Sequence, residues 1–442
     1  MKVERYIPWR RWLWFIGITV LLGSVVGCAA SVRPLLYDVS VEPTVISPNA
    51  DGKDDVTLIR YTLGRTAYVS IYFIDEKGQT YYFRKRRRRA PGPYAVMWGG
   101  VVNVNEVRET PYGRQTILSR VLPSGEYTWV IEAEDLRGRR ARQEGRITIV
   151  DPDTTVPELR NFSVTPRVFT PNRDGIDDRV AITYYLSEDV EEIVVYLRDP
   201  DNPDQVPWIL YETERDIKPT QRGLHYIDYE GGVDREVDPP PDGTYEIVAR
   251  VRDAAGNTTL VTATLTIQEG GVPYADILNA EVTMMDAKDG DRIVAIGDTI
   301  VFTATVENYS DVPIRTSGPP PGTNYKLDES FNTLAARTGN RAWYEQAGVW
   351  RFGIDFQTNP GQFYPFRWAI GRREDLECRI IDGEEQCYLM PGQRGLVYGS
   401  ITINYAPPRR TIVFWSGLIH EDVGILPFNN RVAPHEFIIN IP

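Results

Sequence analysis

Most of the chain alternates hydrophobic and polar residues with a period of two, as β-strands with one buried face do. The run AYVSIYFI at 67–74, for example, places Val69, Ile71 and Phe73 on one face. Similar runs recur at short intervals and are separated by Gly, Pro, Asn and Asp turn signals. The pattern therefore predicts an all-β fold of sandwich type. One short helix is expected at 328–337, DESFNTLAAR.

The N-terminal segment departs from this pattern. Four basic residues within the first eleven positions precede an apolar stretch at 12–27, and the run LLGSVVGC ends at Cys28. This arrangement resembles the lipobox of a bacterial lipoprotein signal peptide, which implies cleavage before Cys28 and lipidation of that residue. The alternative is an uncleaved transmembrane helix, because no charge interrupts residues 12–32. Both interpretations export the rest of the chain and attach it to a membrane.

Two long segments repeat the same order of motifs. SPNADGKDD at 47–55 and TPNRDGIDD at 170–178 are each followed by an alternating strand. Further along, SGEYTWVIEAEDLRG at 124–138 matches DGTYEIVARVRDAAG at 242–256, and each unit then ends in a β-rich strand. The shared order predicts two homologous all-β domains.

These motifs resemble the Ig-like modules of the flagellar hook-capping protein family, which also occur widely in secreted bacterial proteins. The family pattern is S/T-P-N-x-D-G, two strands, a W-x-G-like turn, and a G-x-Y strand ending in D-x-x-G. WGG at 98–100 fits the turn in the first unit, whereas YEGG at 229–232 departs from it in the second. The resemblance covers positions 37–268 and implies an Ig-like fold with a spacer or interaction role.

The region after the linker GGVP at 270–273 has a different pattern. The strand at 298–314 has an apolar face made by alternate residues: Ile300, Phe302, Ala304 and Val306. Gly297–Asn308 resembles the opening strand of adhesion-related Ig-like modules of the CARDB type, and two closing strands around an Asn429-Asn430 turn resemble that family as well. The resemblance implies a third β-sandwich, with an insertion around 320–395.

We therefore expect three tandem Ig-like β-sandwich domains after the signal peptide. The expected boundaries are 1–27 for the signal peptide, 28–36 for a tether, 37–151 for module 1, 152–269 for module 2, and 270–442 for the C-terminal domain. A hydrophobic content of 42% is enough for several folded cores, and the net charge of -12 argues against a nucleic-acid partner.

Cys378 and Cys387 flank Asp382-Gly383, which is a strong signal for a hairpin turn. In an oxidising exported compartment we expect them to form a cross-strand disulfide, which contributes about 2–3 kcal/mol by restricting the unfolded chain. The alternatives are two free thiols or a metal site. The metal site is disfavoured because no further Cys and no nearby His completes a ligand set.

Both S/T-P-N-x-D-G loops carry oxygen ligands around a glycine at the spacing of the middle of an EF-hand calcium loop. The residues are Asn49, Asp51 and Asp55 in the first loop and Asn172, Asp174 and Asp178 in the second. Both loops lack the first acid and the closing Glu of that motif. We therefore favour an Asx turn, in which these side chains accept backbone N–H groups. Structural calcium is the alternative, and no other cofactor is expected.

Six consecutive cations stand out in this acidic protein: Arg84, Lys85, Arg86, Arg87, Arg88 and Arg89. We expect this basic run in a loop at a strand edge, where repulsion keeps the side chains solvated. The functional alternative is a contact with anionic envelope material, such as lipid headgroups or acidic polymer.

The C-terminal domain contains aromatic-rich segments in which Trp350, Tyr364 and Trp368 are candidates for stacking on sugar rings or gripping a peptide. The alternation of these segments explains the same residues equally well as the core of a sandwich.

No enzyme signature is present: the three histidines form no HExxH, and the chain has no G-x-S-x-G motif and no P-loop. We expect a non-enzymatic, lipid-anchored protein on the extracytoplasmic face, at the cell surface or in the periplasm. Modules 1 and 2 would form a stalk for a C-terminal binding domain that serves adhesion or envelope assembly. The expected partners are the membrane, through the lipid, and an envelope protein or polysaccharide. The alternative is an accessory carbohydrate-binding or glycan-processing lipoprotein.

Overall fold

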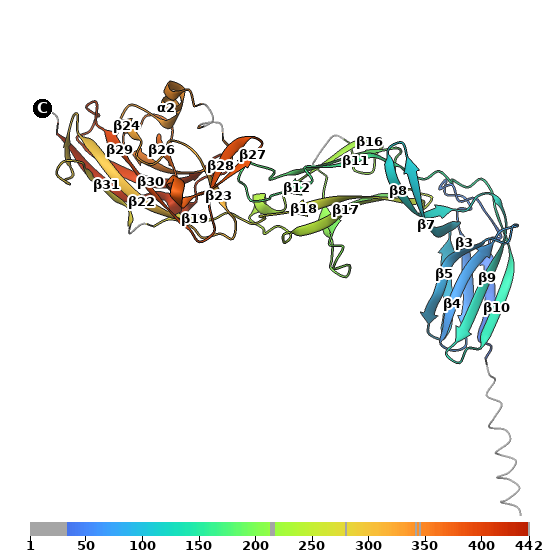
Figure 1. The fold of residues 1–442 in the computed structure, drawn as a ribbon. Coiled ribbons are helices and arrows are strands. Elements are labelled where there is room, and N and C mark those ends of the chain that lie inside the picture. Colours follow the sequence, from blue (N-terminus) through green and yellow to red (C-terminus); the bar gives the residue numbers. More distant parts are fainter. Residues whose placement is uncertain (1–32, 213–216, 279–280, 341–342, 344–345, 441–442) are drawn as a thin grey trace, which may run out of the picture.

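The computed structural model describes residues 33–212, 217–278, 281–340, 343 and 346–440. Their regular secondary structure is almost entirely β, which confirms the predicted fold class of tandem β-sandwiches. Figure 1 shows three bodies in sequence along the chain, with module 1 bent away from the line of the other two. The predicted signal peptide and Cys28 lie outside the described residues. Among the helices that are described, none is long and apolar enough to cross a membrane.

Module 1 is a sandwich of two sheets. The first sheet has the order β1 (Leu36–Glu42), β3 (Thr57–Leu63), β6 (Gly92–Trp98), and the second has the order β2 (Val45–Ile46), β10 (Arg140–Ile149), β9 (Gly125–Asp135), β4 (Ala67–Ile74), β5 (Thr80–Arg89). Alternate residues of β4 point into the core, as its period predicted. Among them Phe73 stacks on Trp98, which the first sheet supplies from the end of β6.

Module 2 repeats this arrangement strand for strand. Its first sheet has the order β11 (Leu159–Thr165), β13 (Val180–Leu186), β16 (Gly223–Tyr229), and its second contains β12 (Val168–Phe169), β18 (Thr258–Ile267), β17 (Gly243–Arg252), β14 (Glu192–Arg198), β15 (Trp208–Leu210). Strands β1 and β11 also share an irregularity in register, between Tyr37 and Ser40 and between Arg160 and Ser163. The repeated motifs thus correspond to a repeated strand order.

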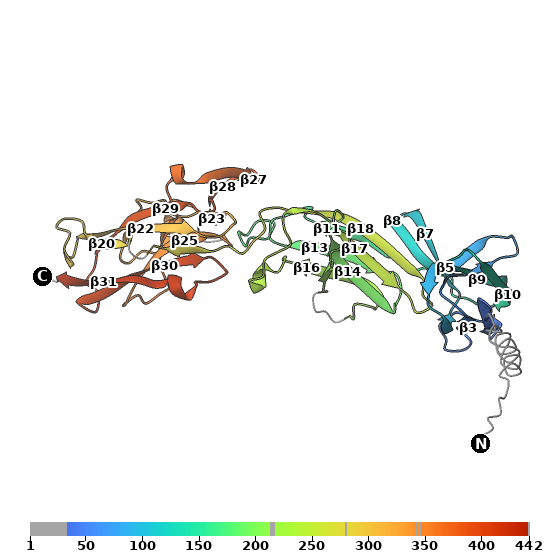
Figure 2. The same ribbon diagram turned by 90° about the horizontal axis from the view of Figure 1, so that it is seen from below.

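A hairpin of module 1 extends the sheet of module 2. Strands β7 (Val101–Thr110) and β8 (Gly113–Val121) follow the turn at 98–100, and β8 pairs with β18 from Thr258 to Leu260. One seven-stranded sheet therefore contains strands of both modules, and β7 and β8 lie beside β18 in Figure 2. The sequence analysis did not identify this hairpin or its partner in the next domain, because alternation identifies a strand and not its neighbour.

The C-terminal domain has two sheets around a separate core. One contains β19 (Ala275–Ile277), β20 (Thr283–Asp286), β22 (Thr299–Asn308), β29 (Arg394–Thr402) and β24 (Asn324–Lys326). The other contains β21 (Ile293–Ala295), β31 (Asn430–Asn440), β30 (Thr411–His420), β25 (Trp350–Phe356), β26 (Phe366–Ala369), β23 (Ile314–Thr316), β28 (Glu384–Leu389) and β27 (Glu377–Ile381). The expected short helix is confirmed as α2 (Phe331–Thr338), which Ser330 caps at its N-terminus.

The expected Asn429-Asn430 turn is wrong. The chain turns over residues 421–429, which include the short helix η6 (Pro427–Asn429), and Asn430 already opens β31. The side chain of Asn429 is buried, donates to the carbonyl oxygen of Ala275 at 2.7 Å, and accepts from the N–H of Ile277 at 3.2 Å. Its amide therefore anchors β19 and does not form the turn.

Candidate functional site

The second S/T-P-N-x-D-G loop lies at the junction between module 2 and the C-terminal domain. The carboxylate of Asp174 is buried and accepts a hydrogen bond of 3.1 Å from the hydroxyl of Tyr388 in β28. Gly175 has a positive φ of 84°, and a Cβ there would lie 2.2 Å from the carbonyl oxygen of Ala347. A side chain at this position would collide with the C-terminal domain, so glycine permits the close approach.

Two further contacts hold this junction. Arg379 in β27 forms an ion pair with Glu269, in which Nη1 donates to both carboxylate oxygens at 2.7 and 2.9 Å. His420, at the end of β30, places Nε2 at 2.7 Å from the carbonyl oxygen of Arg173, and its ring is buried. Together with Tyr388, these contacts come from three strands of the C-terminal domain: β27, β28 and β30. The two domains are therefore joined across a surface and not by the linker alone.

Burial shifts the pKa of Asp174 and of His420 at this junction. Desolvation, reinforced by the nearby carboxylate of Asp178, raises the pKa of Asp174 to about 6. Desolvation lowers the pKa of His420 to about 4. At neutral pH, His420 is therefore uncharged and Asp174 is mostly ionised.

The polar side chains of both S/T-P-N-x-D-G loops accept backbone N–H groups of their own loop. Asp55 accepts from Asn49 at 3.2 Å and from Ala50 and Gly52 at 2.8 Å. In the second loop, Asp178 accepts from the N–H groups of Asn172, Asp174 and Gly175, at 3.1, 3.3 and 2.5 Å. In four further contacts, an Asn or Asp side-chain oxygen accepts the backbone N–H two residues later in the chain.

These contacts run from Asp51 N–H to Asn49, from Lys53 N–H to Asp51, from Asp174 N–H to Asn172 and from Ile176 N–H to Asp174. They are the hydrogen bonds of an Asx turn. Calcium binding by the two loops stays a prediction.

The first loop occupies the equivalent place at the junction between modules 1 and 2. It lines a hollow of about 330 Å³, whose opposite wall includes Ala254 and Ala255 of module 2. Beside it, the amide oxygen of Asn257 accepts the N–H of Val121 in β8 at 2.8 Å, while its nitrogen donates to the carbonyl oxygen of Asp153 at 3.1 Å. Both copies of the motif therefore lie where their module meets the next domain.

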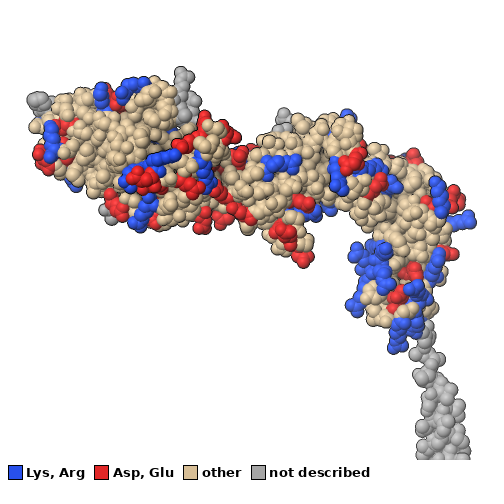
Figure 3. Space-filling view, in the orientation of Figure 1, with Lys and Arg blue, Asp and Glu red and all other residues tan. Residues whose placement is uncertain are grey.

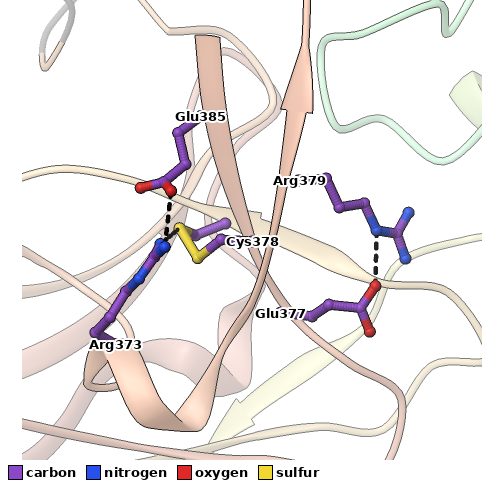
Figure 4. Close-up of a disulfide and its surroundings, with 6 residues drawn as sticks. Arg373, Glu377, Cys378, Arg379 and Glu385 are labelled. Carbon is purple, nitrogen blue, oxygen red and sulfur yellow. Dashed lines mark hydrogen bonds and ion pairs between the residues drawn. A yellow bond between two sulfur atoms is a disulfide. The ribbon is translucent and has the colours of Figure 1, made fainter.

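The predicted disulfide between Cys378 and Cys387 is confirmed. It crosses the hairpin β27–β28, whose two-residue turn places Asp382 and Gly383 at positive φ values of 50° and 83°, as a type I′ turn requires. Figure 4 shows the ion pairs Arg373–Glu385 and Arg379–Glu377 on the two sides of the bridge. The cross-linked hairpin carries Arg379 and Tyr388, and it therefore supplies two of the contacts to module 2.

One group of potential metal ligands occurs in the described part of the chain. Cys378, Glu385 and Cys387 come within reach of a common point. Both sulfur atoms are used by the disulfide, so thiolates could act as ligands only after reduction.

We expected the basic run in a loop, and this prediction is wrong. The run forms the second half of β5. Its pairing with β4 extends to Ala67–Arg89, and β5 is the edge strand of its sheet, so solvent reaches most of the charged side chains. Within the described residues, the only ion pair of the run joins Arg86 to Glu134 at 3.7 Å. Figure 3 shows basic side chains gathered over module 1.

The three aromatic residues predicted as a binding platform belong to the core, which corrects that expectation. Trp350, Tyr364 and Trp368 are 3%, 2% and 0% exposed. Trp368, for example, packs edge-on against Phe302 and Tyr325 between the two sheets. The alternation of these segments had also indicated a sandwich core, and that alternative is the correct one.

A different set of aromatic side chains is exposed on the C-terminal domain. Tyr274 lies between Tyr309 and Phe428, with ring centroids 6.3 and 5.4 Å away, and all three are more than one-third exposed. Tyr274 and Phe428 border a groove of about 320 Å³ that also reaches Arg173 and Glu236 of module 2. Sequence reasoning missed this cluster because its three members come from segments far apart in the chain.

Comparison with known proteins gives distant similarities only. No family model and no curated protein matches the chain. The native conformation of E. coli alpha-2-macroglobulin is 12% identical, with a TM-score of 0.19, and the match covers 93% of this chain and 23% of that one. A Ca²⁺-stabilized adhesin with which an Antarctic bacterium binds ice is 12% identical, with a TM-score of 0.23, over 92% of this chain and 74% of that one.

A tetra-tandem repeat from the extending region of a large adhesion protein is 11% identical, with a TM-score of 0.17, over 86% of this chain and 80% of that one. The chain is thus similar to bacterial adhesin and tandem-repeat β-domain proteins. At these TM-scores the similarities support no argument about function. The hook-capping and CARDB-type resemblances stay predictions.

Proposed function

We infer that this protein is a lipid-anchored structural protein of the extracytoplasmic face, in which modules 1 and 2 hold the C-terminal domain at a set distance from the anchor. The observation that carries this proposal is the construction of the two junctions. One seven-stranded sheet contains strands of modules 1 and 2, and the buried Asp174–Tyr388 contact joins module 2 to the C-terminal domain.

Such junctions restrict bending, because any change of angle must break backbone pairs or leave a buried carboxylate without its partner. The linker is also held: the N–H of Gly271 donates to the carbonyl oxygen of Pro171 at 3.0 Å, and the N–H of Gly270 donates to Asp242 at 3.1 Å. An arrangement of this kind suits a spacer that presents a binding domain for adhesion or envelope assembly. An envelope protein or polysaccharide is the partner class that we propose for the C-terminal domain.

The anchor is tested at Cys28. We expect wild-type protein to fractionate with membranes in high salt and its N-terminal peptide to carry the mass of acyl chains, whereas Cys28→Ser protein loses that mass. An uncleaved, unacylated N-terminus that still fractionates with membranes would favour the transmembrane alternative. Unmodified protein in the aqueous fraction would overturn membrane anchoring altogether.

The exposed rings of Tyr274, Tyr309 and Phe428 favour a second candidate function, the binding of a sugar chain in the groove beside them. A glycan array would test it, with Tyr274→Ala as the variant that weakens binding and Tyr398→Ala, at another partly exposed tyrosine, as the control. Absence of any glycan signal from the wild-type protein would eliminate this candidate. A turnover screen on the same glycans tests the prediction that the protein is not an enzyme.

A further inference from the structure

We propose that the free end of module 1 docks on anionic lipid headgroups, so that the protein is held to its membrane by a basic surface as well as by the lipid. This inference rests on the proposed anchoring at Cys28. It assigns a ligand class to the basic run and an orientation of the molecule relative to the membrane.

Strand pairing locates the end of module 1 that faces away from module 2. Ala67, which opens β4, pairs with both Arg89 and Asp135. The N–H of Gly64, just before β4, donates to the carbonyl oxygen of Leu35 at 3.1 Å. The end of the basic run, the turn after Asp135 and the beginning of the described chain therefore lie together at one end.

This end has more cations than its carboxylates can pair. Asp135 binds Arg65 at 2.8 Å and Arg139 at 2.7 Å, and Glu134 binds Arg140 at 3.1 Å. In the portion of module 1 that the structure describes, several further cations of the basic run and of the turn at 136–139 form no ion pair: Arg84, Lys85, Arg87, Arg88, Arg89 and Arg137. A surface with this excess attracts anionic lipids.

An exposed leucine lies among these charges. Leu136 follows Asp135 at the tip of the turn, and 62% of its surface is exposed. Cations that surround an apolar side chain are typical of surfaces that settle into the headgroup region of a bilayer. An acidic polymer would use the cations but would leave Leu136 without a role, so the combination favours a membrane.

The tether is short enough to keep this surface at the membrane. From Cys28 to Leu35 a fully extended chain spans at most about 25 Å. Electrostatic attraction acts over about 8 Å at physiological salt, a distance that this tether allows the surface to reach. Docking then directs module 1 outward, and because the molecule bends after module 1, module 2 and the C-terminal domain extend over the membrane surface (Figure 1).

The test uses the full acylated chain in vesicles of phosphatidylcholine, with or without phosphatidylglycerol. A donor fluorophore is placed on an Ala90→Cys variant at the free end, or on a Lys77→Cys variant at the opposite end of the same hairpin, and the acceptor is a headgroup-labelled lipid. We expect phosphatidylglycerol to increase energy transfer from position 90 more than from position 77. The increase should be lost in 1 M salt, where the screening length falls to about 3 Å.

A triple variant, Arg87→Gln/Arg88→Gln/Arg137→Gln, should lose the phosphatidylglycerol-dependent increase. A matched variant that removes exposed arginines elsewhere on module 1, Arg108→Gln/Arg114→Gln/Arg146→Gln, should keep it. Equal energy transfer with and without phosphatidylglycerol would overturn docking. Release of the protein from vesicles by salt would instead overturn the anchoring proposal, so the two failures are distinguishable.

Discussion

The hydroxyl of Tyr388 donates a 3.1 Å hydrogen bond to the carboxylate of Asp174, and the two residues are 214 positions apart in the chain. Asp174 belongs to a loop motif that module 1 also contains, but the equivalent Asp51 is exposed. Both copies of the motif lie at a domain junction, but the aspartate at this position is exposed in the first copy and buried against the next domain in the second.

Tyr388→Phe should weaken this junction. The substitution removes one partner of a buried carboxylate, which costs about 1–3 kcal/mol of the free energy of unfolding. Urea unfolding followed by tryptophan fluorescence measures this loss. Tyr398→Phe serves as the control, because Tyr398 is partly exposed. Equal stability of the Tyr388→Phe variant and wild type would show that the contact does not join the domains.

The junction should also respond to pH through Asp174 and His420. The pKa of Asp174 is raised to about 6, so its contribution to stability is full below pH ~4 and is lost as the pH rises through about 6. The pKa of His420 is lowered to about 4, so its contribution is present above pH ~6.5 and is lost as the pH falls through about 4. The two effects oppose each other in this window.

Asp174→Asn removes the first effect and leaves the second. The free energy of unfolding of this variant should therefore rise with pH between about 4 and 6.5 more steeply than that of the wild type. Urea titrations at several pH values in this window measure both slopes. Asp178, whose pKa is also raised by burial, is present in both proteins. If the free energy of unfolding had the same slope against pH in both proteins, the pH effect could not be assigned to Asp174.

Asn257→Ala should loosen the junction between modules 1 and 2. It leaves the N–H of Val121 without its acceptor and Asp253 without an amide donor, at a cost of about 1–3 kcal/mol. Hydrogen exchange should show faster exchange in β8 and in the facing end of β18, with the core of β9 unchanged. Unaltered exchange in β8 would mean that strand pairing alone holds the junction.

The double variant Cys378→Ser/Cys387→Ser should lose the stabilisation that the disulfide provides, about 2–3 kcal/mol. Because the same hairpin carries Arg379 and Tyr388, we expect proteolysis at the linker 270–273 to become faster as well. Reducing agent should reproduce both effects in the wild type. Loss of stability without faster linker cleavage would show that the disulfide does not support the junction between module 2 and the C-terminal domain.

The calcium prediction is tested at Asp55, whose carboxylate accepts three backbone N–H groups. An Asx turn predicts that Asp55→Ala lowers the melting temperature of module 1 to the same extent in calcium and in chelator. Structural calcium predicts that chelator alone lowers the melting temperature of the wild type and has no further effect on the variant.

Several predictions made from local patterns are confirmed. The period of two predicted the strands, Asp382-Gly383 predicted the hairpin and its disulfide, and DESFNTLAAR predicted α2. Each of these depends on interactions between residues close in the chain. The basic run was misplaced because its charges suggested a loop, whereas an edge strand also leaves such side chains in solvent.

The amino-acid sequence by itself determined the all-β class, the repeat of two modules and the Asp382-Gly383 hairpin turn, because strand alternation and turn preferences act over a few residues. Only the tertiary structure decided that β8 completes a sheet of the next module, that Asp174 is buried against Tyr388, and that Tyr274 rather than Trp368 is exposed. These outcomes depend on which surfaces meet when separate domains pack, and that is set by contacts between residues far apart in the chain.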